Sequence, residues 1–98
     1  MLLRLSPTDN VAVATGNFDA GAEAQLDGVV IHLLDRIAVG HKVALVEIPV
    51  GEKVIKFGCP IGSATRAIRA GEHVHTHNLK SDYLPTFTLE TDQKFENK

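Results

Sequence analysis

The sequence lacks tryptophan, has few aromatic residues and contains a single cysteine. Aromatic residues make up 5% of the 98 positions, whereas apolar residues as a whole make up 44%. A hydrophobic core must therefore be built from Val, Ile, Leu and Ala. Because Cys59 is alone, no intrachain disulfide can form. The segment 57–62 contains Gly and Pro, which predicts that this thiol is a structural one in a turn rather than a nucleophile.

A strong charge of either sign and long apolar runs are also missing. The net charge is −2, which argues against a nucleic-acid partner, because such proteins usually carry a basic patch. No apolar run approaches the roughly 20 residues of a membrane span. Arg4 and Pro7 interrupt the first apolar stretch, so no signal peptide is predicted. Together with the missing cysteine pairs, these absences predict a cytoplasmic protein without membrane contact.

Helix signals are scarce, and strand signals are frequent. The best helix candidate is the segment 22–26, far shorter than the roughly 12 residues that make a helix persuasive. Short runs rich in β-branched residues lie between Gly, Pro, Asn and Asp, which is typical of strands. These runs are residues 10–15, 29–33, 43–46, 54–57 and 61–65. The sequence therefore predicts an all-β domain.

One sequence unit recurs around four glycines. An apolar residue stands three positions before Gly40, Gly51 and Gly71, and a weaker copy surrounds Gly21. The interval from Gly21 to Gly51 nearly equals the interval from Gly40 to Gly71. This shared interval predicts an internal duplication with pseudo-twofold symmetry, with a positive φ at each glycine. The duplicated domain is expected to cover residues 1–80, and the polar segment 81–98 is expected to be an extension or linker.

Histidines gather in the stretch 71–79. His73, His75 and His77 occupy alternate positions, so on a strand they would share one face, with Asn78 just behind them. Histidine is a common metal ligand and titrates near neutral pH. The alternative is a solvated strand face that happens to be rich in histidine. His32 stands in an apolar run and is interpreted as a core histidine.

A second polar pair is His41 and Lys42, directly after Gly40. Lys42 could meet a substrate carboxylate, but a solvated turn explains the pair equally well.

Four segments together resemble the amino-terminal part of the altronate dehydratase family. They are 9–14 (DNVAVA), 40–42 (GHK), 54–62 (VIKFGCPIG) and 71–78 (GEHVHTHN). That family includes galactarate dehydratase and, as separate small chains, the alpha subunit of sulfolactate sulfo-lyase. The resemblance covers residues 7 to about 85 and implies a SAF domain of the β-clip fold.

The resemblance implies a lyase that dehydrates a sugar acid to a 2-keto-3-deoxy acid, as in hexuronate catabolism. It implies a divalent metal, iron(II) or manganese, shared with a larger catalytic subunit or domain. His75 and His77 become candidates for catalysis and for metal binding. His41, Lys42 and Asn78 become candidates for substrate binding.

Fused family members continue into a much larger catalytic region. The chain is therefore expected to be a small subunit or an amino-terminal domain that is inactive alone, and the segment 83–87 is a candidate contact to the larger subunit. A homo-oligomer is also compatible with the sequence. The alternatives are a binding module for a sugar acid or a partner protein, without chemistry, and the alpha subunit of a sulfolactate sulfo-lyase.

Overall fold

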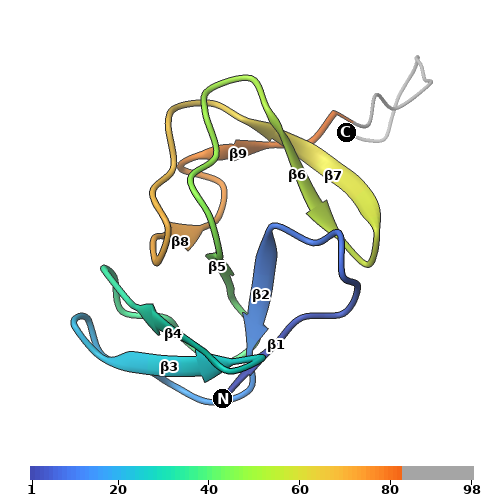
Figure 1. Ribbon diagram of the computed structural model, residues 1–98. Coiled ribbons are helices and arrows are strands. Elements are labelled where there is room, and N and C mark those ends of the chain that lie inside the picture. The colour runs from blue at the N-terminus through green and yellow to red at the C-terminus, as the bar shows by residue number, and fades with distance from the viewer. Residues whose placement is uncertain (83–98) are drawn as a thin grey trace, which may run out of the picture.

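The computed structural model describes residues 1–82, which form an all-β domain (Figure 1). Among these residues there is no helix, and so none long and apolar enough to cross a membrane. The strands in the described part are β1 (Leu2–Leu3), β2 (Val11–Ala14), β3 (Glu23–Leu26), β4 (Val29–His32), β5 (Lys42–Ala44), β6 (Lys53–Lys56), β7 (Cys59–Ala64), β8 (His73–Val74) and β9 (Leu79–Lys80). The prediction of an all-β class is confirmed.

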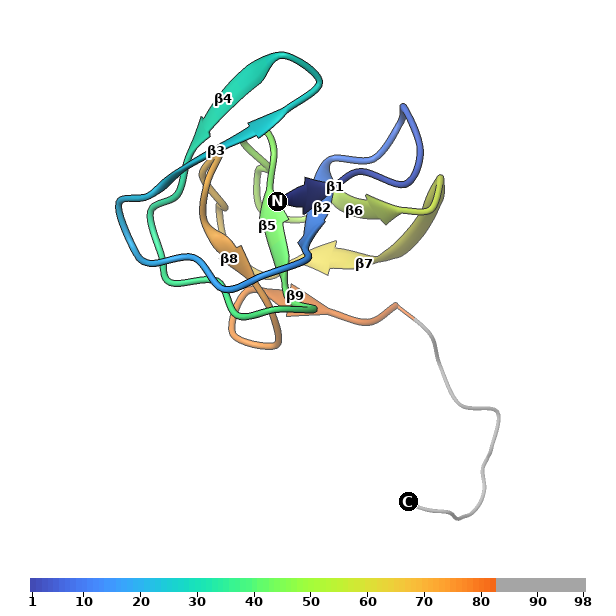
Figure 2. The ribbon, with the colours of Figure 1, turned by 90° about the horizontal axis from the view of Figure 1, so that it is seen from below.

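The strands pair only with antiparallel neighbours and form three small sheets. The first has the order β1-β2-β5-β8, the second is the hairpin β3-β4, and the third has the order β6-β7-β9. The two hairpins, β3-β4 and β6-β7, lie on opposite sides of the central strands β2 and β5 (Figure 2). The first sheet therefore joins the two halves of the domain.

The four glycine turns are the framework of the duplication. Gly21, Gly40, Gly51 and Gly71 all have φ between 84° and 89°, a conformation that costs a residue with a Cβ atom roughly 1–2 kcal/mol. The first two turns and the last two turns make equivalent hydrogen bonds. The N–H groups of Gly21 and Gly40 donate to the carbonyls of Leu33 and Ala14, and those of Gly51 and Gly71 donate to Ala64 and Ala44. The repeated glycines thus mark two structurally equivalent halves.

Each half contains one hairpin closed by two residues of positive φ. These are Asp27 and Gly28 (53° and 79°) in the first half, and Phe57 and Gly58 (58° and 70°) in the second. Turns of this kind match the right-handed twist of the strands and favour Asn-Gly or Asp-Gly. Asp27-Gly28 follows the preference, but Phe57 does not. Asp9, from the loop before β2, accepts hydrogen bonds from the N–H groups of Phe57 and Gly58 and holds that turn.

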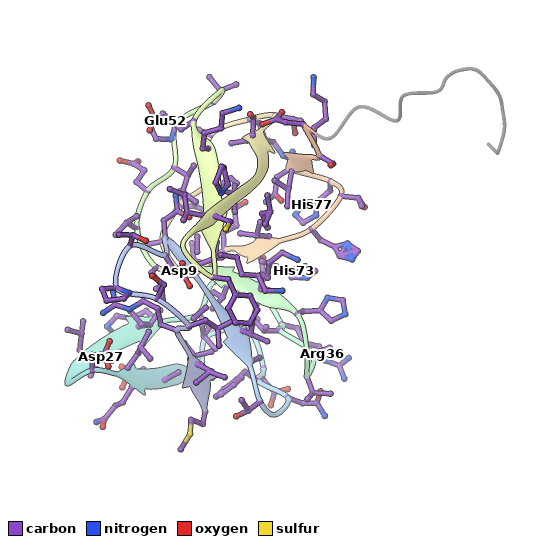
Figure 3. All side chains as sticks on the ribbon, turned by 90° about the vertical axis from the view of Figure 1, so that its right-hand side faces the viewer. Asp9, Asp27, Arg36, Glu52, His73 and His77 are labelled. Carbon is purple, nitrogen blue, oxygen red and sulfur yellow. The ribbon has the colours of Figure 1, made fainter. Side chains whose placement is uncertain are left out.

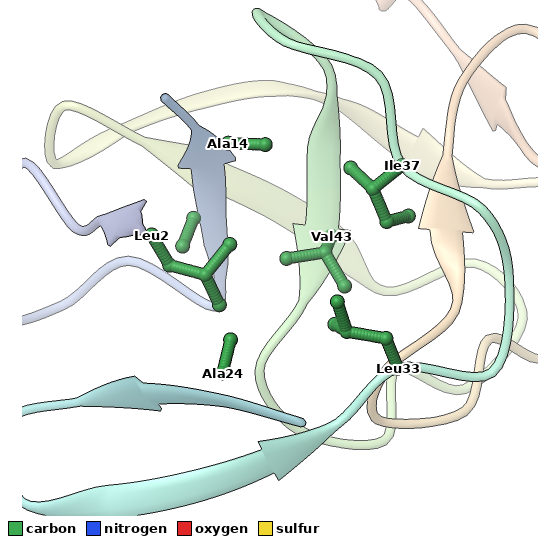
Figure 4. Close-up of a cluster of buried hydrophobic side chains, with 7 residues drawn as sticks. Leu2, Ala14, Ala24, Leu33, Ile37 and Val43 are labelled. Carbon is green, nitrogen blue, oxygen red and sulfur yellow. The ribbon is translucent and has the colours of Figure 1, made fainter. Parts of the chain in front are cut away.

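The domain has two small cores, and strands β2 and β5 contribute side chains to both. Figure 4 shows the first, in which Leu33, Ile37 and Val43 lie close to the N-terminal Leu2. In the second core, Ile68 and Val74 take the places that Ile37 and Val43 have in the first, together with the aliphatic residues Val11, Ala44, Ile48, Val54 and Ala64. Aliphatic side chains fill both cores, as the scarcity of aromatic residues predicted.

The segment 22–26, the best but unpersuasive helix candidate, forms a strand, in which Glu23–Leu26 alternates between solvent and core and pairs with β4 through a two-residue turn. Two other local predictions were wrong. Cys59 begins β7 and is exposed, since the turn ends at Gly58. His32 is also exposed, and its Nδ1 lies 3.3 Å from the carboxylate of Glu23. The predicted contact segment 83–87 lies outside the described residues.

Candidate functional site

The candidate site forms where β5 of the first half pairs with β8 of the second. Lys42 is the register partner of Val74, and Val43 is the partner of His73. Residues directly opposite in an antiparallel pair share a face, so Lys42 lies on the face of Val74, which belongs to the second core, and His73 lies on the face of Val43, which belongs to the first. Gly40 and Gly71 direct the chain into these strands with equivalent turns, in which the following residue donates to the carbonyl two positions before the glycine, at 3.0 Å.

The chain does not continue as a strand after Val74, so the predicted strand over 71–79 was wrong. Asn78 ends it, because its side chain competes with the strand ladder for backbone groups. Its Oδ1 accepts the N–H of His75 at 2.9 Å, and its Nδ2 donates to the carbonyl of His73 at 2.8 Å. The N–H groups of Asn78 and Leu79 both donate to the carbonyl of His75. A tight loop, residues 75–78, results, which we call the His loop.

Four imidazoles gather on one side of the molecule, where Figure 3 shows His73 and His77. His41 and His75 are stacked, with ring centroids 5.1 Å apart and an interplanar angle of 19°. The ring of His73 lies 5.1 Å from that of His41 and 5.5 Å from those of His75 and His77. The Nδ1 atom of His41 and the Nε2 atom of His73 form a hydrogen bond of 2.9 Å, whose donor depends on the tautomers. We call these four residues the imidazole cluster.

The cluster disfavours a positive charge on its central member. Burial lowers the pKa of His73, and the neighbouring His75, His41 and His77 lower it further. The carboxylate of Asp35 opposes this, and its Oδ2 also accepts the backbone N–H of His73 at 2.9 Å. His73 is thus held as a neutral imidazole that can accept or donate a proton.

A hollow of about 170 Å³ lies beside the cluster. Its polar wall is formed by Lys42, His75, Thr76 and Ser81, and its apolar wall by Ile61 and Leu79. Burial lowers the pKa of Lys42, and the charge of Lys56 lowers it further. Polar groups on one wall and apolar side chains on the other suit a small, hydroxylated organic acid.

The structure brings the rings of His41 and His75 together, and it places Lys42 and His75 in the lining of one hollow. His77 lies beside His73 rather than beside His41 in the ring contacts found among residues 1–82. Asn78 is fully buried, with both ends of its amide bound to the backbone, so in this arrangement it shapes the His loop and does not line the hollow. Sequence reasoning did not select His73, although its place two residues after Gly71 matches that of Lys42 after Gly40.

The described residues do not form a complete metal site. Nowhere in residues 1–82 do three or more His, Cys, Asp or Glu side chains surround a point that could hold a metal ion. His75 and His77 are exposed, and neutral imidazoles are good metal ligands. As they stand, they are part of a ligand set at most, and the remaining ligands would have to come from outside this part of the chain.

A family model described as the altronate/galactarate dehydratase SAF domain matches residues 1–82. This chain therefore belongs to that family of SAF domains. Altronate dehydratase of Escherichia coli is 42% identical to it over 80 residues, which is 82% of this chain and 16% of that protein. Galactarate dehydratase of Escherichia coli is 37% identical over 73 residues, or 74% of this chain and 14% of that protein.

A smaller relative is the alpha subunit of (2R)-sulfolactate sulfo-lyase from Chromohalobacter salexigens. It is 47% identical over 47 residues, which is 48% of this chain and 50% of the subunit. The chain therefore corresponds to a small part of the dehydratases and to half of a subunit in the sulfo-lyase. These relatives are named as two dehydratases and a sulfo-lyase subunit.

Proposed function

We propose that this chain is the small part of a sugar-acid lyase of the altronate dehydratase type. In this role it forms one wall of an active site whose other walls belong to a larger catalytic subunit or domain. The observation that carries the proposal is the junction of β5 and β8. There, the cationic hollow of Lys42 lies directly beside the imidazole cluster.

Dehydration of a sugar acid needs three functions around one substrate. A base removes the proton α to the carboxylate, an acid protonates the departing β-hydroxyl, and a positive charge stabilises the enolate-like intermediate. The carbon–oxygen bond breaks, water leaves, and the enol product tautomerises to a 2-keto-3-deoxy acid. Imidazoles suit both proton transfers, because their pKa lies near neutral pH.

The residues of this chain divide these tasks. Lys42 holds the substrate carboxylate at the mouth of the hollow. His75, which lines the hollow, and His77, in the His loop, exchange protons with the substrate. His41 keeps the ring of His75 in place by stacking. His73, neutral and hydrogen-bonded to His41, fixes the tautomer of that ring.

A divalent metal, iron(II) or manganese, would supply Lewis-acid stabilisation of the enolate charge. His75 and His77 are the candidate ligands from this chain, and the larger subunit or domain would provide the others. A site shared in this way agrees with the incomplete donor set of residues 1–82.

The sulfo-lyase relationship favours a second candidate, in which the chain is the alpha subunit of a sulfolactate sulfo-lyase. The alpha subunits from Chromohalobacter salexigens and Paracoccus pantotrophus are both 47% identical to this chain over the matched part. A third hypothesis, a module that binds a sugar acid without chemistry, uses the same hollow and predicts binding in the absence of turnover.

An assay with and without the larger subunit tests the proposal. The chain is purified alone, supplied with ferrous iron or manganese, and tested for formation of a 2-keto-3-deoxy acid from altronate and galactarate. We expect no turnover from the chain alone and turnover when the larger family subunit is added. His77→Ala should abolish turnover without preventing assembly, whereas His32→Ala, an exposed histidine on the first hairpin, should change little. Turnover by the isolated chain would refute the subunit role.

A further inference from the structure

One edge of β4 has no neighbouring strand in the described part of the chain. Among residues 1–82, β4 pairs only with β3. The N–H of Leu33 donates to the carbonyl of Ala22 on the β3 side. Because hydrogen bonding alternates along an antiparallel pair, the backbones of Ile31 and Val29 also face β3, and the N–H and carbonyl of Val30 face the free edge. An apolar strand with a free edge is a template for pairing with another chain.

An apolar groove runs along this strand. Two adjoining hollows, of about 350 Å³ and 290 Å³, share Val29, Ile31 and Leu45 in their linings. The side chain of Val29 is mostly exposed, and those of Ile31 and Leu45 are only partly buried against the first core. We call the two hollows together the β4 groove. A groove beside a free strand edge suits an extended segment with alternating apolar side chains.

The equivalent hairpin of the second half, β6-β7, has a third strand. Strand β9 pairs with β7 at Ser63 and Ala64, and its residue Leu79 packs against the second core. Beside β4, a single contact stands in the corresponding place. The carbonyl of Gly71 accepts the N–H of Leu34, and no strand of residues 1–82 continues along the edge. Within the described residues, the first half therefore lacks an apolar strand of the kind that completes the second.

The sequence beyond residue 82 contains a segment with a strand pattern. Residues 86–90 (TFTLE) alternate polar and apolar side chains and directly follow a proline, which is tolerated where a strand begins. On a strand, Phe87 and Leu89 would share one face. Such a face has the apolar character that the β4 groove requires.

The described chain ends on the half of the domain that does not contain β4. The carboxylate of Asp82 lies 2.6 Å from Nζ of Lys53 and accepts the hydroxyl of Ser63 at 2.7 Å. Figures 1 and 2 show that the chain leaves β9 on the side away from β4. From Asp82 to Phe87 the chain spans at most about 18 Å. The direction of the last described residues therefore favours the groove of a neighbouring molecule as the place where this segment binds.

We infer that two copies of this chain form a twofold dimer, in which residues 86–90 of each copy add a strand to β4 of the other. Phe87 and Leu89 then fill the β4 groove of the partner copy. Reciprocal exchange uses both segments and both grooves, so the assembly closes at two copies.

This interface is separate from the candidate site. Figure 3 shows Asp27, at the tip of the β3-β4 hairpin, on the opposite side of the molecule from His73 and His77. Figure 2 likewise separates the hairpin tip from the loop between β8 and β9. A larger subunit that covers the imidazole cluster therefore leaves the hairpin free. The inference goes beyond the proposed function and does not depend on it.

Sedimentation of the full chain over a wide range of concentrations tests the dimer. We expect a reversible equilibrium between one and two copies. Phe87→Asp places a charge where an apolar side chain binds, and it should weaken the dimer at least about tenfold, because the burial of a phenylalanine is lost. Phe95→Asp makes the same change outside residues 86–90 and should leave the dimer unchanged.

A second pair of variants tests the groove. Val29→Lys should weaken the dimer as Phe87→Asp does, whereas Val50→Lys, at an exposed valine outside the lining of the groove, should not. Thermal melts show whether each variant remains folded. A mixture of Phe87→Asp and Val29→Lys contains one intact contact, between the segment of the second variant and the groove of the first. The other contact opposes two introduced charges of opposite sign, so the mixture should associate more tightly than either variant alone.

Three results would overturn the inference. The first is a chain that stays monomeric at every concentration. The second is a dimer that Val29→Lys weakens and Phe87→Asp does not, which would indicate direct pairing of two β4 edges. The third is a mixture of the two variants that associates no better than its components. Dehydration of a sugar acid is measured separately with the larger subunit, so these results leave the proposed function untouched.

Discussion

The carboxylate of Asp9 spans 48 residues of sequence to accept the backbone N–H of Phe57 at 3.1 Å. Its second oxygen accepts the N–H of Gly58 at 2.8 Å, and the N–H groups of Leu5 and Ser6 complete the set. One side chain thus fixes both the loop before β2 and the turn between β6 and β7.

This contact predicts a loss of stability in acid. Burial alone would raise the pKa of Asp9, but hydrogen bonds from Gly58, Phe57, Ser6 and Leu5 outweigh it and lower the pKa. The folded state therefore favours the ionised form. Its stabilising effect is complete above the unfolded pKa of about 3.9 and is lost as the pH falls through the lower folded value. Thermal melts of wild type and Asp9→Asn between pH 7 and pH 2.5 should converge at the acidic end. A constant difference would contradict the prediction.

The turn at Phe57 offers a stabilising substitution. Phe57 has φ of 58°, a conformation that Asn tolerates better than Phe, and its side chain is 65% exposed. Phe57→Asn creates an Asn-Gly turn equivalent to Asp27-Gly28, and we expect it to raise the free energy of unfolding by about 1 kcal/mol. Urea denaturation measures the effect. Phe57→Leu, which keeps the strain and the apolar character, is the matched control and should not stabilise.

Gly71 and Gly51 have the same φ to within a few degrees but different surroundings. A Cβ atom at Gly51 would meet open space, whereas one at Gly71 would overlap the carbonyl oxygen of His32. Gly51→Ala should cost about 1–2 kcal/mol for its backbone conformation alone. Gly71→Ala should cost roughly 3 kcal/mol or more, because the chain must also shift. Similar losses in the two variants would show that the contact with His32 is not tight in solution.

Protonation of His73 should lower the stability of the domain in mild acid. The pKa of His73 is lowered by burial and by its histidine neighbours, so the unfolded chain binds more protons than the folded one just below the unfolded pKa. The stabilising effect is complete above the unfolded pKa of about 6.5 and is lost as the pH falls from there through the lower folded value. Melting temperatures at pH 7.5, 6.5 and 5.5 test this. His73→Gln, which cannot be protonated there, should flatten the dependence, and His32→Gln should not.

The repeat around the glycines could be predicted from sequence because it depends on local backbone geometry. A positive φ is a property that glycine alone adopts freely, so Gly21 and Gly51 mark equivalent turns wherever they stand. Ala24 and Leu26 stand two positions apart and both face the core, and this spacing was also visible in the sequence. The segment was nevertheless too short for its hydrophobic period to distinguish a strand from a helix.

The His loop could not be predicted in the same way. The alternation of His73, His75 and His77 indicated a strand. The side-chain amide of Asn78 prevents this strand by hydrogen-bonding the backbone, and its partners are known only from the three-dimensional structure.

The second residue after each of the four repeated glycines stands directly before a buried residue. This position has different contacts in the different copies. After Gly21 and Gly51, this position holds Glu23 and Lys53. Glu23 contacts His32 across the β3-β4 hairpin, and Lys53 forms an ion pair with Asp82, which follows β9. After Gly40 and Gly71, the same position holds Lys42 and His73, on opposite faces of the β5-β8 pair. Lys42 lines the hollow, His73 belongs to the imidazole cluster, and His75 belongs to both. Neither half by itself contains the junction of β5 and β8. A chain with a single copy of the unit would therefore have no place to assemble the imidazole cluster and the hollow, so the candidate site depends on the duplication.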